Sequence, residues 1–526
     1  MPSIIIYGRS TTVTAGTTVL AAARGLGIEV PTLCQRDGCV PFTSCMVCVV
    51  KDAAGGRMIP SCTALADDGM RIETDTAEVR DARRVALELL LSDHVGDCAA
   101  PCQRACPAHL HIPLMLRQIA AGRLPEALAT VTQAIPFPAV LGRICPAPCE
   151  KACRRAAHDD AVSICLLKRF VGDTALAIGT PHLPPRSPAT GKRIALVGAG
   201  PAGLSAAYYL LQHGHACTII DEHDEPGGAL RHAIPAERLP RAVLDGEIEP
   251  LRRMGAEFRL RTRLGRDVAL ADLQRDFSAV VLAMGKLDLQ FAAGLAVELT
   301  ASGVRIHPHT AETSVRGIFA GGDVVHPHGM AIRAVAAGRT IACAVHQFVS
   351  GQPVSGLHHR FDSLIGRLHE GECDQLMPEA NPAPGLHPPS DSPRGLPDAA
   401  ARTQAARCLH CDCRKANTCR LREYADAYDA KQRRYTSAER RPIVFDRRHA
   451  RIVFEPGKCI RCGLCVQITR NAAERLGLTF IGRGFDVHIG VPFDESLADA
   501  LSHTAAECVA ACPTAALAFR VKDEGA

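Results

Sequence analysis

The sequence contains no tryptophan, and phenylalanine and tyrosine bring its aromatic content to only 4%. It has no uninterrupted apolar run of the ~18 residues that a membrane helix needs, so we expect no membrane span. Neither sign of charge dominates, because 60 Lys and Arg face 55 Asp and Glu, and this balance argues against nucleic-acid binding. The start of the chain lacks the basic region, apolar core and cleavage site of an export signal, which favours the cytoplasm.

Cysteine is abundant by contrast, with 24 in 526 residues, a length that predicts three or four domains. Thiols stay reduced in the cytoplasm. Here they are clustered instead of scattered, and only Cys217, Cys343 and Cys373 stand alone. Clustered thiols in a long chain of this kind favour metal ligation over a disulfide framework.

Residues 1–80 contain the first group of candidate ligands: Cys34, Cys45, Cys48 and Cys62. Gly38 and Pro41 predict a loop between the first two, and backbone N–H groups of such a loop can bond cluster sulfides. The spacing resembles the [2Fe–2S] domain at the head of the iron–sulfur subunit of complex I and related hydrogenases, which implies a β-grasp ferredoxin fold. A structural zinc site is the alternative. Cys39 falls outside the pattern.

Residues 81–185 are predicted to be helical, because apolar positions recur with helical spacing over 79–92. Four candidate ligands follow at intervals of four residues: His94, Cys98, Cys102 and Cys106. A later group comprises Cys145, Cys149 and Cys153. The segment 136–153 resembles the N-terminal domain of the glutamate synthase small subunit and of dihydropyrimidine dehydrogenase. That resemblance implies an α-helical domain in which the cysteines of two [4Fe–4S] clusters interleave.

The resemblance assigns Cys102 and Cys153 to one cluster, and Cys106, Cys145 and Cys149 to the other. The Arg-Cys-Leu-x-Cys sequence that opens the domain in this family is missing, and His94 and Cys98 stand in its place. His94 also resembles the ligand of a His-plus-three-Cys cluster of complex I, although it could instead cap a helix end. The non-cysteine ligand of the family aligns near Lys168, so Cys165 is a candidate substitute; its alternative is a buried thiol.

Residues 190–352 contain a strand, a glycine-rich turn, a helix and a second strand that ends in an acidic residue. This order predicts a Rossmann-like dinucleotide-binding domain. In it the first glycine makes the turn, the second lets a pyrophosphate approach, the third permits helix packing, and the acid binds ribose hydroxyls. The motif comprises Gly198, Gly200, Pro201, Ala202, Gly203 and Asp221.

Two further segments favour FAD. Residues 226–235, with Gly228 and Arg231, and residues 317–323, with Gly322 and Asp323, resemble flavin-binding segments of the glutamate synthase small subunit. A domain that has lost its flavin is the alternative. In that family a whole nicotinamide-nucleotide domain lies between the two motifs, but here only 125 positions separate Gly198 from Asp323, and no second glycine fingerprint occurs. We therefore predict that the usual NAD(P)H-binding domain is missing.

Residues 353–400 are predicted to be a linker that is rich in proline and glycine toward its end. Residues 401–440 form a cysteine segment with Cys408, Cys411, Cys413 and Cys419. Four thiols within twelve residues can close on one [4Fe–4S] cluster, with zinc as the alternative. A third possibility is that the segment reaches back to complete the upstream pair, because residues 407–411 read Arg-Cys-Leu-His-Cys.

Residues 441–526 contain a Cys-x2-Cys-x2-Cys group and a later Cys-Pro. They resemble a two-cluster bacterial ferredoxin in its complex I form, in which the cysteine before proline ligates the cluster of the other half. Only one complete set survives, and it comprises Cys459, Cys462, Cys465 and Cys512. We expect one [4Fe–4S] cluster here, with Cys508 left free.

The sequence therefore predicts a multidomain α/β and α+β protein with FAD, one [2Fe–2S] cluster and three or four [4Fe–4S] clusters. The resembled families imply an electron-transfer subunit of an oxidoreductase linked to NAD(P)H, hydrogenase or formate dehydrogenase. Its partners would be a nucleotide-binding flavoprotein, a hydrogenase, a molybdenum or tungsten enzyme, or soluble ferredoxin. The alternatives are a self-contained NAD(P)H:acceptor oxidoreductase of glutamate synthase small-subunit type and a scaffold without redox function. No catalytic residue is identified.

Overall fold

The computed structural model describes residues 1–179, 182–287, 291, 293–327, 329–386, 395–435 and 439–520. The chain divides into two compact units. Unit 1 combines residues 1–99, 360–376 and 411–526, and unit 2 combines residues 100–359 and 377–410. Unit 2 is therefore inserted in the sequence of unit 1. Within the described ranges, no helix is both long and apolar enough to cross a membrane.

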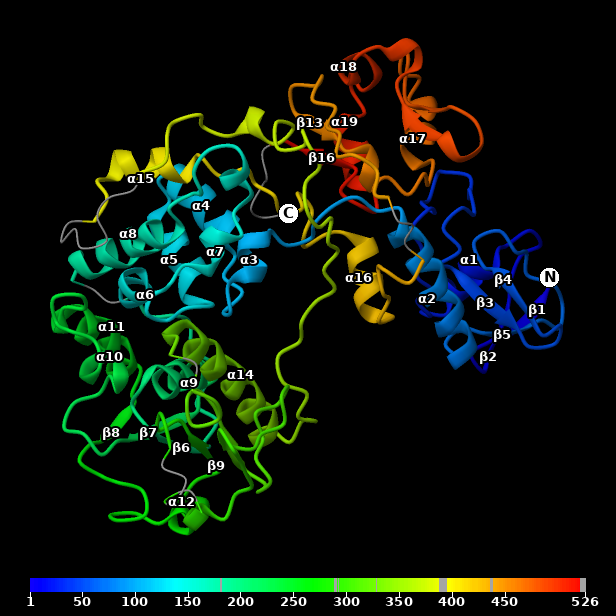
Figure 1. Cartoon of the computed structure of the whole chain (residues 1–526). Coiled ribbons are helices and arrows are strands. Elements are labelled where there is room, and N and C mark those ends of the chain that lie inside the picture. The colour runs from blue at the N-terminus through cyan, green and yellow to red at the C-terminus, as the bar shows by residue number, and fades with distance from the viewer. Residues whose placement is uncertain are drawn as a thin grey trace. The chain divides into compact units, whose positions relative to one another are not determined.

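The N-terminal part of unit 1 is a mixed five-stranded sheet with one helix, coloured blue in Figure 1. The sheet has the order β2-β1-β5-β3-β4, in which β1 pairs in parallel with β5. Alternating Ile4 and Ile6 face a core that the helix α1 closes. The elements are β1 (Ser3–Ile6), β2 (Arg9–Thr12), α1 (Val19–Gly25), β3 (Val49–Asp52), β4 (Arg57–Pro60) and β5 (Arg71–Glu73).

The remainder of unit 1 consists of one long helix, several short helices and two pairs of antiparallel strands. The long helix α2 (Ala77–Ser92) begins at Thr76, whose hydroxyl accepts the Val79 N–H at 3.3 Å, and it ends just before His94. Strands β13 and β16 pair antiparallel, and so do β14 and β15. The elements are α16 (Arg420–Ala427), β13 (Ile452–Phe454), η4 (Pro456–Lys458), α17 (Leu464–Asn471), β14 (Thr479–Ile481), η5 (Gly484–Asp486), β15 (His488–Gly490), η6 (Pro492–Asp494), α18 (Leu497–Ala500), α19 (Ala505–Ala511) and β16 (Leu517–Phe519).

Unit 2 begins with a helical part, in which proline occupies the first turn of most helices, where its missing N–H is not needed. Helices α6 and α8 pack so closely that a Cβ on Gly172 would lie 2.4 Å from the Ala139 nitrogen. The absence of a side chain at Gly172 permits this approach. Helix α15 packs on α4 and α8 (Figure 1). The elements are α3 (Pro101–Ala105), α4 (Ile112–Ala120), α5 (Leu124–Thr132), α6 (Pro138–Ile144), α7 (Pro148–Lys151), η1 (Arg154–Ala157), α8 (Ile164–Ala177), η3 (Met377–Glu379) and α15 (Asp398–Ala405).

The second part of unit 2 is a parallel five-stranded sheet of order β12-β9-β6-β7-β8. Helices α9 and α14 pack against each other beside it (Figure 1). Its elements are β6 (Arg193–Val197), α9 (Pro201–Gln212), β7 (Ala216–Ile220), α10 (Ala229–His232), α11 (Arg241–Arg253), β8 (Glu257–Arg259), α12 (Leu270–Asp276), β9 (Ala279–Leu282), η2 (Ala293–Leu295), β10 (Leu299–Thr300), β11 (Gly303–Val304), β12 (Ile318–Ala320) and α14 (Ala331–Val349).

A buried carboxyl joins the two parts of unit 2. Glu247 on α11 accepts the N–H groups of Ala139 at 2.6 Å and Val140 at 2.8 Å, at the start of α6. Burial raises the pKa of Glu247 from 4.5 to about 8, although the two N–H bonds oppose the shift. The unfolded chain ionises this group at lower pH than the folded chain does. Its contribution to stability is therefore complete below pH 4.5 and decreases as pH rises toward 8.

We accordingly expect Glu247→Gln to flatten the fall in apparent melting temperature between pH 5 and 8, because a neutral amide does not titrate there. Glu249→Gln, on the same helix but partly exposed, is the control and should follow the wild type. Thermal denaturation at several pH values measures both variants. Identical pH profiles for wild type and Glu247→Gln would contradict the prediction.

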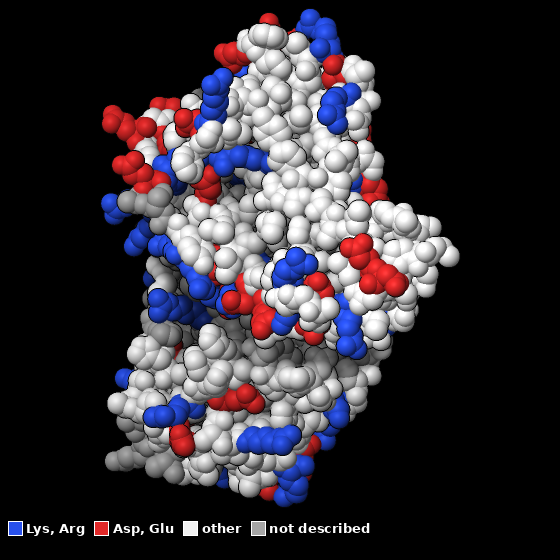
Figure 2. Space-filling view, turned by 90° about the vertical axis from the view of Figure 1, so that its right-hand side faces the viewer, with Lys and Arg blue, Asp and Glu red and all other residues white. Residues whose placement is uncertain are grey.

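Charges of both signs are interspersed on the face shown in Figure 2, and much of that face carries neither. Many exposed arginines pair with a nearby carboxylate, as Arg266 does with Asp267 at 2.8 Å and Arg275 with Asp272 at 2.9 Å. Exposed pairs of this kind contribute little to stability. They do neutralise local charge, which agrees with the balanced composition.

Candidate functional site

A cavity of about 600 Å³ lies at the carboxyl ends of the central strands of the unit 2 sheet. Gly198 follows β6, Asp221 follows β7 and Ala283 follows β9, and all three line the cavity. Ligands of parallel α/β sheets bind at this edge, where loops from neighbouring strands converge. The cavity is therefore the candidate nucleotide site.

In the glycine turn between β6 and α9, one glycine permits close packing of the backbone and another leaves space for a ligand. A Cβ on Gly203 would lie 2.0 Å from the Gly198 carbonyl oxygen, whereas a Cβ on Gly200 would meet no protein atom within 4 Å. Gly200 therefore leaves open space beside the cavity, next to the start of α9, where helix N–H groups favour a phosphate. Pro201 and Ala202 also line the cavity. This geometry fits a dinucleotide pyrophosphate.

Asp221 holds the loops at the cavity together. One carboxylate oxygen accepts the Ala199 N–H at 2.6 Å, and the other accepts the His223 N–H at 2.9 Å and lies 2.7 Å from His223 Nδ1. A carboxylate has about four acceptor positions, so these bonds leave capacity for a ribose hydroxyl. The arrangement is compatible with the role that the sequence motif predicts.

Of the remaining residues predicted to bind flavin, some line the cavity and others hold the loops that surround it. Gly228 and Asp323 line the cavity. Arg231 is not among the described lining residues; it is buried and donates to the Pro226 carbonyl at 2.7 Å, to Glu225 at 3.2 Å and to Asp245. It therefore fixes the 226–231 loop from behind. Gly322 lies in the loop after β12, beside Ala202.

Several lining residues were not predicted from the sequence. His223 and His232 stack with ring centroids 4.3 Å apart at the cavity, and Arg263 and Lys286 contribute two cations to its lining. The N-terminus of the 19-residue helix α14 also reaches the cavity through Ala331. No sequence motif marks the isolated histidines and cations.

The four predicted [2Fe–2S] ligands of unit 1 come together in the interior. Cys34, Cys45, Cys48 and Cys62 are each no more than 2% exposed, and the Sγ atoms of Cys34 and Cys45 are 3.4 Å apart. A hydrogen bond from Cys45 lowers the pKa of Cys34 to about 5, and one from Cys48 lowers the pKa of Cys62 to about 7. The same pairing raises the pKa of Cys45 and of Cys48. Four thiols in this space fit a [2Fe–2S] cluster, because bound iron would offset the repulsion between their thiolates.

The four ligands predicted for the C-terminal module line one small apolar cavity: Cys459, Cys462, Cys465 and Cys512. The Arg461 N–H points to the Cys459 sulfur at 3.4 Å, as expected for an amide that stabilises a bound thiolate. Burial raises the pKa of Cys459 to about 11. Cys508 is absent from the described lining and lies fully buried in the adjacent hydrophobic core. The donor set fits one [4Fe–4S] cluster.

A further candidate ligand set of unit 1 combines residues from both sides of the insertion: His94, Cys98, Cys413 and Cys419. The Cys413 N–H donates to the Cys98 carbonyl at 3.1 Å. Burial, together with the charges of Cys413, Cys98 and Cys512, raises the pKa of Cys419 to about 12. His94 Nδ1 is buried without a hydrogen-bond partner, and burial and the charge of Lys458 lower the pKa of His94 to about 3. A neutral imidazole with a free lone pair is suited to bind a metal.

The sequence places His94 and Cys98 at the head of the helical domain and groups Cys413 and Cys419 with Cys408 and Cys411. A segment that reaches back to the upstream pair is only one of its three alternatives. The boundary between the two units falls between His410 and Cys411. Cys411 is half-buried at the start of the last segment of unit 1. No spacing rule connects cysteines that are more than 300 residues apart in the sequence, with another unit between them.

The helical part of unit 2 brings Cys106, Cys145, Cys149 and Cys165 around a buried lysine. Lys168 lies 3.8 Å from Cys165 Sγ. Burial lowers the pKa of Lys168, but the four surrounding thiols raise it by more, so the ammonium stays charged. The Cys165 N–H donates to Glu150 at 2.7 Å, which fixes the start of α8. Cys165 thus stands where a fourth thiolate would complete the set.

The three ligand sets of unit 1 are neighbours. Burial raises the pKa of Cys462 and that of Cys419, and the nearby thiols Cys34 and Cys512, respectively, add to the two shifts. Leu33, Cys34, Cys419 and Cys462 also share one hydrophobic core. Among the described residues no group of three or more His, Cys, Asp or Glu could hold a metal ion. Because a cluster puts several irons and sulfides between its cysteines, its ligands stand farther apart than those of one ion.

Three family models match separate parts of the chain. Residues 3–77 match a 2Fe-2S iron-sulfur cluster binding domain, residues 91–180 match dihydropyrimidine dehydrogenase domain II with its 4Fe-4S cluster, and residues 196–245 match an NAD(P)-binding Rossmann-like domain.

Relatives from bacteria are similar over about a third of the chain. The beta subunit of the NADP(+)-dependent formate dehydrogenase of Moorella thermoacetica is 42% identical over 35% of this chain and 29% of its own length. The beta subunit of the NADPH-Fe(3+) oxidoreductase of Geobacter sulfurreducens is 42% identical over 35% and 28%. The NADPH glutamate synthase small chain of Escherichia coli is 38% identical over 37% and 42%.

The chain thus spans less than half the length of these relatives. A solved NAD+-reducing [NiFe]-hydrogenase aligns over 99% of this chain and 88% of its own, but the TM-score of 0.36 and identity of 11% are too low to support an argument. The family models and the relatives together establish that the chain combines a 2Fe-2S domain, a 4Fe-4S domain of the dihydropyrimidine dehydrogenase type and a Rossmann-like nucleotide-binding domain.

Proposed function

We propose that this chain is an electron-transfer subunit of a larger oxidoreductase, with FAD in the cavity of unit 2. One [2Fe–2S] cluster would be bound by Cys34, Cys45, Cys48 and Cys62, and [4Fe–4S] clusters by the other ligand sets. The observation that carries the proposal is the contiguity of the three thiol sets in unit 1. A bound flavin exchanges electrons in pairs or singly, whereas clusters carry one at a time.

The short stretch between β9 and β12 supports a subunit over a self-contained reductase. The described residues there include only η2 and the two-residue strands β10 and β11. A nicotinamide must be held against the flavin for hydride transfer, and this stretch contains no dinucleotide-binding domain in its described residues. The source of electrons would therefore be another chain, such as a nucleotide-binding flavoprotein, a hydrogenase, a molybdenum or tungsten enzyme, or soluble ferredoxin. The relatives from Moorella and Geobacter are named as subunits, which favours such a complex.

Anaerobic mixing tests the proposal. The purified chain should contain about one flavin and at least about 14 irons, the sum of one [2Fe–2S] and three [4Fe–4S] clusters. NADH or NADPH alone should leave the flavin absorbance unchanged, whereas dithionite should bleach it completely. Dithionite serves as the control that the flavin is competent. Rapid bleaching by either nucleotide would contradict the missing-domain argument and establish a self-contained reductase.

A further inference from the structure

Two thiols of the helical part of unit 2, Cys102 and Cys153, lie outside the set around Lys168. Helix α3 contains Cys102 and packs against α7, which contains Cys149. Cys106 caps the C-terminal end of α3, and Cys153 lies two residues after the end of α7. Each of the two packed helices is therefore associated with one cysteine of the Lys168 set and with one cysteine outside it.

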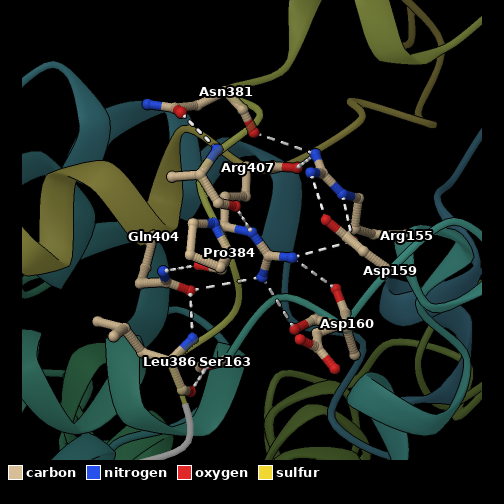
Figure 3. Close-up of polar contacts among 11 residues, drawn as sticks. Arg155, Asp159, Asp160, Ser163, Asn381, Pro384, Leu386, Gln404 and Arg407 are labelled. Carbon is tan, nitrogen blue, oxygen red and sulfur yellow. Dashed lines mark hydrogen bonds and ion pairs between the residues drawn. The ribbon is translucent and has the colours of Figure 1, made fainter.

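A downstream segment is locked onto this region by a fully buried arginine. Arg407 donates to the Asp159 carboxylate at 3.0 Å and to the carbonyls of Asp160 at 2.9 Å and Ala383 at 2.8 Å (Figure 3). None of its side chain is exposed. Its bonds join α15 and the segment after η3 to the end of η1, which lie more than 200 residues apart in sequence.

A second buried arginine completes the network. Arg155 holds both oxygens of Asp159, at 2.6 and 2.7 Å, and donates to the carbonyls of Asn381 and Arg407, each at 3.2 Å (Figure 3). Both arginines hold the pKa of Asp159 well below its usual range. Burying two guanidinium groups is unfavourable unless each finds such partners, and the resulting bonds permit only one register of the segment.

The network fixes the backbone beside two thiols. Arg155 lies two residues after Cys153, and Arg407 immediately precedes Cys408. The Arg155 guanidinium bonds the carbonyl at the peptide between Arg407 and Cys408. Cys408 is buried, and its sulfur accepts the His410 N–H at 3.4 Å, the kind of bond that stabilises a ligating thiolate. His410 in turn lies 3.4 Å from Arg117 on α4, so the loop is held from both sides.

We propose that Cys408 binds a further [4Fe–4S] cluster together with Cys102 and Cys153, and that Arg155, Asp159 and Arg407 position it. A segment that follows the Rossmann-like part in the sequence thus supplies a ligand to a cluster of the helical part. The proposal extends the electron-transfer function and rests on it. In sequence the next thiol after Cys408 is Cys411, three residues on.

Paired substitutions in the full chain test the assignment. Cys408→Ala should lower the iron content by about four per chain and remove one reduced-cluster signal from the electron paramagnetic resonance spectrum. Cys102→Ala combined with Cys408→Ala should cause no further loss, because both remove the same cluster. Cys413→Ala combined with Cys408→Ala should lose about eight irons, because the two thiols serve different clusters.

Two results would overturn the assignment: unchanged iron and spectrum in Cys408→Ala, or an equal loss in Cys413→Ala, Cys408→Ala and their double variant. Cys343→Ser is the control, since its hydroxyl can replace the thiol that donates to the Gly356 carbonyl at 3.4 Å. Flavin content and the [2Fe–2S] signal should persist in all variants. If the wild type itself contained no flavin and showed no [2Fe–2S] signal, the proposed function would be refuted instead.

The positioning role has its own readout. Arg407→Met should broaden or shift the g values of this cluster alone, because its thiolate is no longer held in one register, whereas Arg407→Lys should recover only part of the wild-type spectrum, since an ammonium cannot reproduce the planar set of bonds. A wild-type spectrum for this cluster in Arg407→Met would overturn the positioning role. If that variant does not fold, Asp159→Asn, which keeps the side-chain shape and is partly exposed, gives the same measurement.

Discussion

A Gly200→Ala variant should fold normally but bind flavin roughly 5- to 100-fold more weakly. Its Cβ would meet no protein atom within 4 Å, and the glycine has an ordinary backbone conformation with φ −82°. The added methyl group would instead occupy the space beside the cavity that a pyrophosphate needs. Overpacking by one carbon costs about 1–3 kcal/mol, and each 1.4 kcal/mol is tenfold in affinity.

Gly203→Ala is the companion variant, and it should lose flavin for a different reason. Its Cβ would lie 2.0 Å from the Gly198 carbonyl oxygen, so the turn and α9 must move apart even without a ligand. We therefore expect Gly203→Ala to lower both the flavin content and the melting temperature. Gly294→Ala is the control, because Gly294 is not among the described lining residues and its added Cβ would meet no atom within 4 Å. Titration of the apoprotein with FAD gives the affinities, and a wild-type FAD affinity in Gly200→Ala would refute the assignment of the cavity.

Sequence motifs were sufficient to predict those parts of the site whose residues lie close together in the sequence. The glycine turn lies between β6 and α9 because a buried strand leads directly into Gly198 and a helix follows Gly203. The thiols at 34–62 and at 459–512 also converge within their own modules. In these cases spacing along the chain and neighbourhood in space coincide, since short loops connect the elements.

The sequence allows contacts across the insertion only as one of three alternatives for the cysteine segment 401–440, and it does not select that alternative. Cys98 and Cys413 meet because unit 2 folds between them as a compact unit, and nothing near either residue records this. The proline-rich stretch predicted to be a linker shows the same difficulty. Its composition predicts an extended chain, but residues 360–376 pack with unit 1 and residues 377–410 with unit 2. Extended backbone carries no pattern that specifies the surface on which it docks.

Arg231 illustrates a different limit. The segment 226–235 resembles a flavin-binding loop, but the resemblance does not distinguish a side chain that touches the ligand from one that holds the loop. In the structure the Arg231 guanidinium donates hydrogen bonds to the carboxylates of Glu225 and Asp245. The stacked His223 and His232 contribute to the cavity although no motif contains them. Such roles depend on side-chain direction, which only the folded chain determines.

Replacing Lys168 by methionine should lower the reduction potential of the cluster bound by Cys106, Cys145, Cys149 and Cys165. The ammonium is buried among these thiols, 3.8 Å from Cys165 Sγ, and its positive charge stabilises the more negative reduced cluster. Methionine fills a similar volume without charge. Low dielectric strengthens the interaction, so we expect a fall of roughly 60 mV or more, which is tenfold in a one-electron equilibrium.

A redox titration followed by electron paramagnetic resonance measures this shift cluster by cluster. Lys168→Arg keeps the charge and should remain closer to the wild-type potential, while Lys151→Met, on the exposed end of α7, should change none of the potentials. Cys165→Ala should remove the affected signal, which identifies the cluster that the lysine influences. An unchanged potential in Lys168→Met would show that the ammonium serves packing alone. A shift in a different cluster would show that Cys165 is not the fourth ligand of the set around Lys168.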